Sequence, residues 1–274
     1  MNVSSLGLSE LRNRLRVGCL GLAIGEFEIC LKSSLPQVAE NLHLFYAEYP
    51  LCSDTEASDF YIELKSPGLL RRYYRPQVLF SHDGFIPFKP LPMDQAFATF
   101  EWGLNWCVAS SAHHYLVIHA AVVERDGAAF IFPGTPGSGK STLSAALATR
   151  GWRLLSDEMT MLSLKDGLIT PFLRPVSLKN ASIDVIRRFS PGVCIGEIIR
   201  DTAKGTVAHM RPPADSVRRG GERARPAMLV FPRYEAGSDP VLQPVSRGQA
   251  FMDVASNSFN YHVLGESAFD LLVV

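Results

Sequence analysis

The sequence lacks a long hydrophobic run, a signal-peptide core and any closely spaced pair of cysteines. No segment reaches the roughly 18 apolar residues that a membrane-spanning helix requires, and residues 1–16 mix polar and apolar side chains. The five cysteines are scattered without a CxxC pair, which favours incidental thiols in a reducing compartment. We therefore expect a cytoplasmic protein that does not span a membrane.

An excess of charge of either sign is also missing. Lysine plus arginine and aspartate plus glutamate each number 27, so the whole chain offers nucleic acid no basic excess. The sequence has no platform of interleaved aromatic and basic residues either. Nucleic acid is therefore excluded as the main partner. Hydrophobic residues make up 47% of the 274 residues, which is enough for a core in one large or two modest domains.

The two halves of the chain differ in pattern. Residues 1–110 contain short strand-like and helical segments but no chemical motif, which predicts a small N-terminal α+β domain for substrate or oligomer contacts. Residues 111–274 alternate strands and helices around a glycine-rich segment, which predicts an α/β domain that binds nucleotide. Residues 211–225 combine five arginines with proline and glycine pairs, a composition typical of a mobile basic loop.

A glycine-rich segment matches the phosphate-binding pattern GxxxxGK[ST]. Glycines let successive backbone N–H groups point at phosphate oxygens, and the following helix adds the positive end of its dipole. Lys140 would reach the β- and γ-phosphates, and the Ser141 hydroxyl would bind Mg²⁺. The motif does not distinguish ATP from GTP, although ATP is the simpler expectation. The residues predicted to hold the nucleotide are Gly134, Thr135, Pro136, Gly137, Ser138, Gly139, Lys140, Ser141 and Thr142.

The segments around this loop fit a βαβ unit. Residues 128–132 predict a buried strand, residues 141–150 a helix and residues 152–156 a second strand. Asp157 and Glu158 end that second strand, where an acid can hold Mg²⁺ or take the proton of an attacking hydroxyl. The alternative is that Asp157 caps a helix or lies on the surface.

His119 lies in a predicted strand at residues 116–123, ahead of the glycine-rich loop. A single histidine in a strand is more often a core or surface residue than a catalytic one. Asp126-Gly127 predicts a hairpin turn into the strand that precedes the loop.

The chain from His119 to Glu158 resembles the bacterial HPr kinase/phosphorylase family, and most closely its HPr kinase-related, type A branch. The resemblance rests on residues 119–123, 134–141 and 150–158, and it is weaker over residues 171–180 and 205–213. That branch is found beside small peptide-binding chaperones. The family carries two consecutive aspartates where this chain has Asp157-Glu158, and its substrate-side domain is not matched by the first half.

This resemblance implies a P-loop kinase core of the HPr kinase / PEP carboxykinase type. It implies that the protein uses ATP and Mg²⁺ to phosphorylate a serine hydroxyl of a protein or peptide, with a co-encoded peptide chaperone as a further partner. Asp157 would be the base, His119 would lie near the transferred phosphate, and Ser141, Asp157 and Glu158 would surround the metal. A homo-oligomer is also implied.

Two arginines could supply positive charge to the transferred phosphate. Phosphoryl transfer requires cations around the equatorial oxygens, and Arg174 or Arg211 could reach them. Each could equally be a solvated or ion-paired surface residue.

Three functions stay open from the sequence. The first is a kinase for a protein or peptide hydroxyl, the second an ATP-binding or ATPase scaffold without transfer activity, and the third a small-molecule kinase. The resemblance favours the first, but the residues themselves do not identify the phosphate acceptor.

Overall fold

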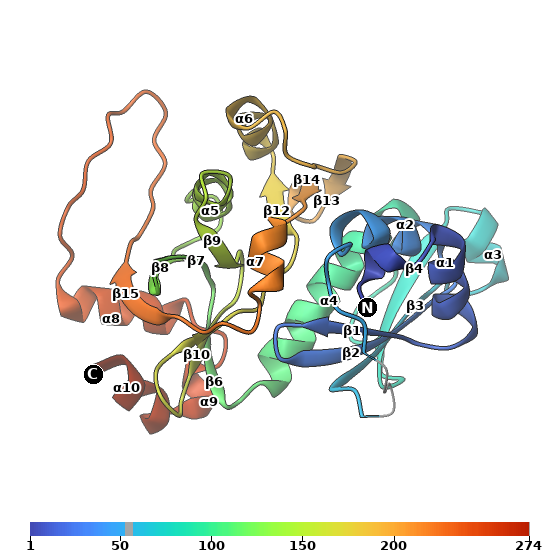
Figure 1. The fold of residues 1–274 in the computed structure, drawn as a ribbon, viewed down its shortest axis with the longest axis horizontal. Coiled ribbons are helices and arrows are strands. Elements are labelled where there is room, and N and C mark those ends of the chain that lie inside the picture. The colour runs from blue at the N-terminus through green and yellow to red at the C-terminus, as the bar shows by residue number, and fades with distance from the viewer. Residues whose placement is uncertain (53–56, 274) are drawn as a thin grey trace.

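The computed structural model describes residues 1–52 and 57–273 and shows a mixed α/β protein with several sheets (Figure 1). The first half forms a five-stranded sheet in the order β1-β2-β3-β4-β5. Strands β2 and β3 run parallel, and the other neighbours run antiparallel. The strands are β1 (Leu20–Ile24), β2 (Phe27–Ser33), β3 (Phe60–Lys65), β4 (Gln77–His82) and β5 (Leu91–Pro92).

Helices accompany this sheet, and one of them joins it to the second half. Helix α4 packs against β3, β4 and α2 and is largely buried, including Phe97, Phe100 and Leu104. A helix that is apolar on most sides needs neighbours on most sides, and α4 lies between the two halves in Figure 1. The helices of the first half are α1 (Leu8–Val17), α2 (Pro36–Phe45), α3 (Leu69–Tyr73) and α4 (Ala96–Ser111).

The second half contains three smaller sheets, in the orders β15-β8-β7-β9, β11-β10-β6 and β12-β14-β13. The strands are β6 (Tyr115–Ile118), β7 (Ala120–Arg125), β8 (Ala128–Pro133), β9 (Arg153–Ser156), β10 (Thr160–Ser163), β11 (Ile169–Thr170), β12 (Val176–Lys179), β13 (Ile199–Thr202), β14 (Gly205–Met210) and β15 (Arg225–Leu229). The helices are α5 (Lys140–Ala148), α6 (Ala181–Phe189), α7 (Ala214–Arg218), α8 (Arg247–Ser256), α9 (Tyr261–Leu264) and α10 (Glu266–Val273).

The four-stranded sheet sets the geometry of the candidate site. Strand β7 lies between β8 and β9 and runs antiparallel to both, so β8 and β9 point in the same direction. The glycine-rich loop follows β8, and Asp157 follows β9. Both therefore lie at the same edge of the sheet, with α5 packed against β7 and β9. The predicted order of strand, loop, helix and strand is confirmed.

Two local expectations are wrong. The predicted strand at residues 116–123 is interrupted at His119, so that β6 and β7 belong to different sheets. The predicted basic loop at residues 211–225 contains helix α7, in which Ser216 and Val217 are buried. Its arginine Arg223 pairs with Asp166 at 2.7 Å. Local composition suggested a loop, but a buried helical face and an ion pair fix this segment.

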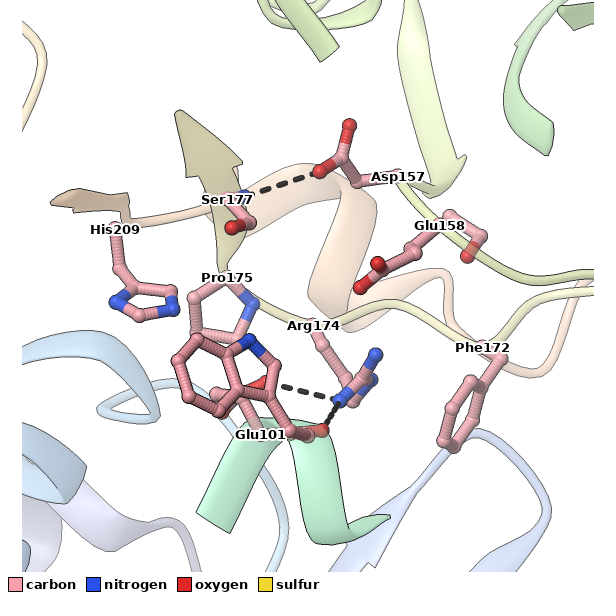
Figure 2. A pocket seen from close by; sticks show the side chains of 10 residues that line it. Glu101, Asp157, Glu158, Phe172, Arg174, Pro175, Ser177 and His209 are labelled. Atoms are coloured by element: carbon pink, nitrogen blue, oxygen red, sulfur yellow. Dashed lines mark hydrogen bonds and ion pairs between the residues drawn. The ribbon is translucent and has the colours of Figure 1, made fainter. Parts of the chain in front are cut away.

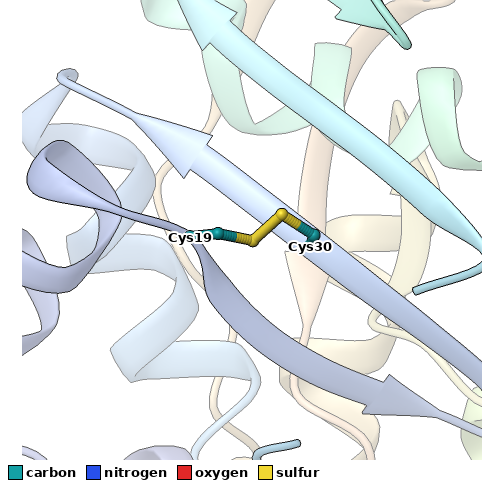
Figure 3. Close-up of a disulfide and its surroundings, with 2 residues drawn as sticks. All are labelled: Cys19 and Cys30. Atoms are coloured by element: carbon teal, nitrogen blue, oxygen red, sulfur yellow. A yellow bond between two sulfur atoms is a disulfide. The ribbon is translucent and has the colours of Figure 1, made fainter. Parts of the chain in front are cut away.

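The cysteines also depart from expectation, because Cys19 and Cys30 form a disulfide bond (Figure 3). Cys30 lies on β2, and Cys19 immediately precedes β1. The antiparallel pairing of β1 and β2 brings the two Cα atoms within 5.4 Å of each other, although they are 11 residues apart in sequence. Cys52, Cys107 and Cys194 carry free thiols. Sequence spacing alone did not reveal this hairpin contact.

Within residues 1–52 and 57–273, no helix combines the length and apolar character needed to cross a membrane.

Candidate functional site

The glycine-rich loop takes a backbone shape that requires its glycines. The φ angles are 151° at Gly134, 87° at Gly137 and 102° at Gly139. Residues that carry a Cβ rarely adopt such backbone angles. Helix α5 begins directly after Gly139, so the unpaired N–H groups of its first turn lie beside the loop. An anion would therefore meet backbone N–H groups and the positive end of a helix here.

Lys140 is buried at the base of this loop. Its Nζ donates hydrogen bonds to the carbonyl oxygens of Gly134 at 2.5 Å and Thr135 at 3.1 Å. Burial, with Lys179 as the next contribution, lowers the pKa of Lys140. An ammonium held by neutral carbonyls among other cations retains a strong attraction for an anion.

Asp157 is a buried carboxylate with two defined hydrogen bonds. Its Oδ1 accepts from Ser144 Oγ at 3.1 Å. Its Oδ2 accepts from the backbone N–H of Ser177 at 3.0 Å, a bond drawn in Figure 2. Burial, and then the neighbouring charge of Glu158, raise the pKa of Asp157, while hydrogen bonds from Ser177 and the Ser141 side chain act against this rise. A carboxylate with a raised pKa is a better proton acceptor.

Glu158 has the opposite electrostatic character. Its Oε2 accepts from Asn105 Nδ2 at 2.8 Å, and its Oε1 lies 3.3 Å from Lys204 Nζ. Burial alone would raise the pKa of Glu158, but Lys204, Lys179 and other cations lower it to about 2. Two adjacent acids therefore differ: Asp157 is suited to accept a proton, and Glu158 stays ionised.

A narrow pocket opens beside these acids, between the two halves of the chain. Helix α4 contributes one wall, and the others come from the end of β9 with the two acids that follow it, the segment from Phe172 into β12, and strand β14 (Figure 2). Its lining residues are Glu101, Trp102, Ser156, Asp157, Glu158, Phe172, Arg174, Pro175, Ser177 and His209.

Arg174 lies in this pocket beside the two acids, but most of its guanidinium is engaged. Nη1 donates to the Glu101 carbonyl at 2.8 Å and to Glu101 Oε2 at 3.0 Å, and Nη2 donates to Asn105 Oδ1. Its Nε is buried and has no partner within the described residues. Arg174 thus holds α4 against the site, and its buried Nε–H is left for a ligand.

His119 occupies the break between β6 and β7. Its backbone N–H donates to the Asn257 carbonyl at 2.7 Å, and its ring lies 5.5 Å from that of Phe259. Burial and then the charge of Lys140 lower the pKa of His119 to about 4. The ring is therefore neutral at neutral pH.

Arg211 does not line the pocket beside Asp157 and Glu158. It is exposed and lines a second pocket together with Ala148 and Thr149. Those residues end α5, whereas the glycine-rich loop precedes it, and a helix of nine residues is about 13 Å long. The structure therefore offers no support for Arg211 at a transferred phosphate.

Sequence reasoning missed several residues that surround the acids. Lys179 ends β12, Lys204 lies in the turn before β14, and both influence the pKa values of His119 and Glu158. His209 faces the pocket from β14 and is almost fully buried, with an Nε2 that has no partner in the part of the chain described. Nothing in the local pattern of these residues signals a site, because long-range strand pairing assembles them.

The sequence predicts that Ser141, Asp157 and Glu158 surround a magnesium ion. No cluster of three His, Cys, Asp or Glu side chains suited to a metal occurs among residues 1–52 and 57–273. However, the Ser141 side chain lies near enough to Asp157 to lower the pKa of its carboxyl, and Glu158 follows in sequence. Mg²⁺ is typically held by one or two carboxylate or hydroxyl oxygens, with phosphates and water completing its shell.

No protein-family model matches this chain, and no curated protein sequence matches it either. The resemblance drawn from residues 119–158 therefore remains a prediction.

Proposed function

We propose that this protein is an ATP- and Mg²⁺-dependent kinase with a P-loop core, which transfers the γ-phosphate to a hydroxyl group. The acceptor that we favour is a serine hydroxyl of a protein or peptide. The observation that carries the proposal is the position of Asp157. It is a buried carboxylate with a raised pKa at the same sheet edge as a glycine-rich loop of phosphate-binding sequence.

The residues can be assigned to the steps of transfer. The loop N–H groups and Lys140 would hold the β- and γ-phosphates, with Mg²⁺ neutralising their oxygens when bound. Asp157 would accept the proton as the acceptor oxygen forms its bond to the γ-phosphorus. The bond from that phosphorus to the β-phosphate oxygen would break, and ADP would leave with the electron pair.

The cations near the two acids support a function in phosphoryl transfer more than a function in ATP binding alone. Burial and then the charge of Lys179 lower the pKa of Lys140, and Lys204 pairs with Glu158. Such a concentration of positive charge would stabilise the negative charge that spreads over the phosphoryl oxygens in the transition state. A scaffold that merely retains ATP needs no buried base, which makes this alternative the weaker one.

A small-molecule kinase is the second candidate, and the pocket is compatible with it. Glu101 and Trp102 of α4 close one side of the space beside Asp157, so that a bulky acceptor would have limited access. A serine side chain and a compact alcohol both satisfy this restriction. The family resemblance, and not the pocket, gives the peptide first place.

The test uses ATP labelled at the γ-phosphate, with the purified protein, Mg²⁺ and the proteins encoded next to its gene. We expect label in one of these proteins, at a serine located by mass spectrometry, and none with the Lys140→Met variant. Calorimetry with Mg-ATP should show binding to the wild-type protein. Absence of binding at millimolar nucleotide would reject the proposal, and transfer to a metabolite but not to protein would select the second candidate.

A further inference from the structure

The chain that follows β15 runs along β8 to the glycine-rich loop. The Val230 N–H donates to the Ile131 carbonyl at 2.9 Å, and the Tyr234 N–H donates to the Ser138 carbonyl at 3.1 Å. After Tyr234 the segment has no regular structure until α8 begins, and it forms the long open loop between β15 and α8 in Figure 1. Tyr234 is therefore attached to the glycine-rich loop although it lies about 100 residues further along the chain.

This contact orients one peptide group of the loop. A trans peptide bond holds its C=O and N–H in opposite directions. Because the Ser138 carbonyl points at Tyr234, the N–H of Gly139 points away from Tyr234. The backbone of Tyr234 thus fixes the direction of one N–H group in the loop proposed to bind phosphate.

The side chain of Tyr234 remains free to meet a ligand. It is 76% exposed, which is unusual for an aromatic ring in an ordered contact. Its Cβ would lie 3.4 Å from a Cβ placed on Gly139, so the ring starts directly beside the residue that precedes α5.

The order of the strands indicates which end of a nucleotide would meet this ring. In the sheet β15-β8-β7-β9, Asp157 follows β9 on one side of β8, and Tyr234 follows β15 on the other. Transfer requires the γ-phosphate to lie towards Asp157. The glycine-rich loop follows β8, between Asp157 and Tyr234. If this loop holds the polyphosphate with its γ end towards Asp157, the nucleoside lies towards β15 and Tyr234.

We propose that Tyr234 stacks on the base of the bound nucleotide and that the segment from Val230 to Tyr234 forms the nucleoside side of the site. This inference rests on the proposed function, because it requires a nucleotide in the loop. An aromatic platform binds any base through its flat face, so this contact adds affinity for the nucleoside without choosing between adenine and guanine.

The experiment compares two ligands by calorimetry: Mg-ATP, and magnesium tripolyphosphate, which has the phosphates but no base. The variants are Tyr234→Ala, which removes the ring, and Tyr234→Phe, which keeps it. Leu242→Ala is the control, because Leu242 is 89% exposed on the same segment. Stacking on one base corresponds to roughly tenfold or more in affinity.

We expect Tyr234→Ala to weaken ATP binding by about tenfold and to leave tripolyphosphate binding unchanged. Tyr234→Phe and Leu242→Ala should bind both ligands as the wild type does. An equal loss for both ligands, or no loss for ATP, overturns the inference. Wild-type protein that binds ATP and tripolyphosphate with equal affinity overturns this inference alone, whereas wild-type protein that binds neither overturns the proposed function with it.

Discussion

The backbone N–H of Ser177 donates a hydrogen bond to Asp157 Oδ2 at 3.0 Å and thereby joins β12 to the end of β9. Ser144 of α5 holds the other oxygen of the same carboxylate. The carboxylate is thus fixed from two elements that belong to different parts of the second half. A base held in one orientation can meet an acceptor hydroxyl without further rearrangement.

The first prediction concerns this carboxylate. Asp157→Asn keeps a side-chain oxygen but cannot accept a proton, so we expect phosphoryl transfer to fall by about 10²- to 10⁴-fold while Mg-ATP binding persists. Transfer by the wild type should also decline as pH falls through the raised pKa of Asp157, since the protonated carboxyl is inactive as a base. Asp270→Asn, at an exposed position on α10, is the control. Transfer by Asp157→Asn at the wild-type rate would remove Asp157 as the base.

The second prediction is a pH dependence of stability from Glu101. Burial, opposed by Arg174, raises the pKa of this side chain to about 7. In the unfolded chain it would ionise near its ordinary pKa of 4.5. Between these two values the folded state retains a proton that the unfolded state loses, so rising pH favours unfolding.

We therefore expect the free energy of unfolding of the wild type to fall relative to Glu101→Gln as pH rises from about 4.5 to about 7, by on the order of 3 kcal/mol. Above that window the difference should be constant. Urea denaturation of both proteins at several pH values measures it, and Glu10→Gln serves as an exposed control. A difference that does not change with pH would show that Glu101 ionises normally in the folded protein.

The sequence predicted the local part of the fold and the local part of the site. The pattern around Asp126-Gly127 gave the β7–β8 hairpin, and the GxxxxGK[ST] spacing gave a loop with three left-handed glycines before a helix. These features depend on backbone conformations that only certain residues adopt, so a short stretch of sequence specifies them.

The remainder of the site depends on contacts between distant segments. Arg174 was considered as a ligand for phosphate, yet it chiefly binds Glu101, which lies 73 residues earlier on α4. His209 and Lys179 reach the acids because β12 pairs with β14. Arg211 directly follows β14, the strand that carries His209, but it lines a different pocket. Which residues share a pocket follows from sheet pairing and register, which sequence spacing does not specify.

The third prediction concerns the buried ion pair between Glu124 and Arg153. The Arg153 guanidinium binds Glu124 and also donates to the carbonyls of Arg219 at 3.0 Å and Glu222 at 2.8 Å, so it links β7 and β9 to the end of α7. Arg153→Met would leave a buried carboxylate without its partner. We expect a loss of about 3–5 kcal/mol in the free energy of unfolding.

Arg12→Met is the matched control, because Arg12 and Glu40 form an ion pair whose side chains are about half exposed. That variant should lose less than about 1 kcal/mol. Chemical denaturation measures both. Equal losses in the two variants would mean that the Glu124–Arg153 pair is hydrated in the folded protein.

The fourth prediction concerns the backbone of the glycine-rich loop. Gly139 has a φ of 102°, so Gly139→Ala would force a strained conformation costing about 1–3 kcal/mol or change the loop. We expect weaker binding of both Mg-ATP and tripolyphosphate, since in the proposed site the altered backbone N–H groups would contact the phosphates. Gly221→Ala is the control, because a Cβ there meets no atom within 4 Å. Unchanged binding by Gly139→Ala would show that the loop shape is not needed for phosphate.

The last prediction concerns the disulfide bond between Cys19 and Cys30. It closes a short loop at the β1–β2 hairpin, and in the chain-entropy account such a cross-link stabilises the fold by about 3 kcal/mol, because it restricts the unfolded chain. Under oxidising conditions we expect Cys19→Ser to lower the free energy of unfolding by about this amount. Under reducing conditions the wild type and the variant should be equally stable, since both then unfold without the cross-link. Cys194→Ser, which removes a free thiol, is the control for loss of sulfur alone. If the wild type keeps its advantage over Cys19→Ser in reductant, the stabilisation comes from packing of the Cys19 side chain and not from the bond.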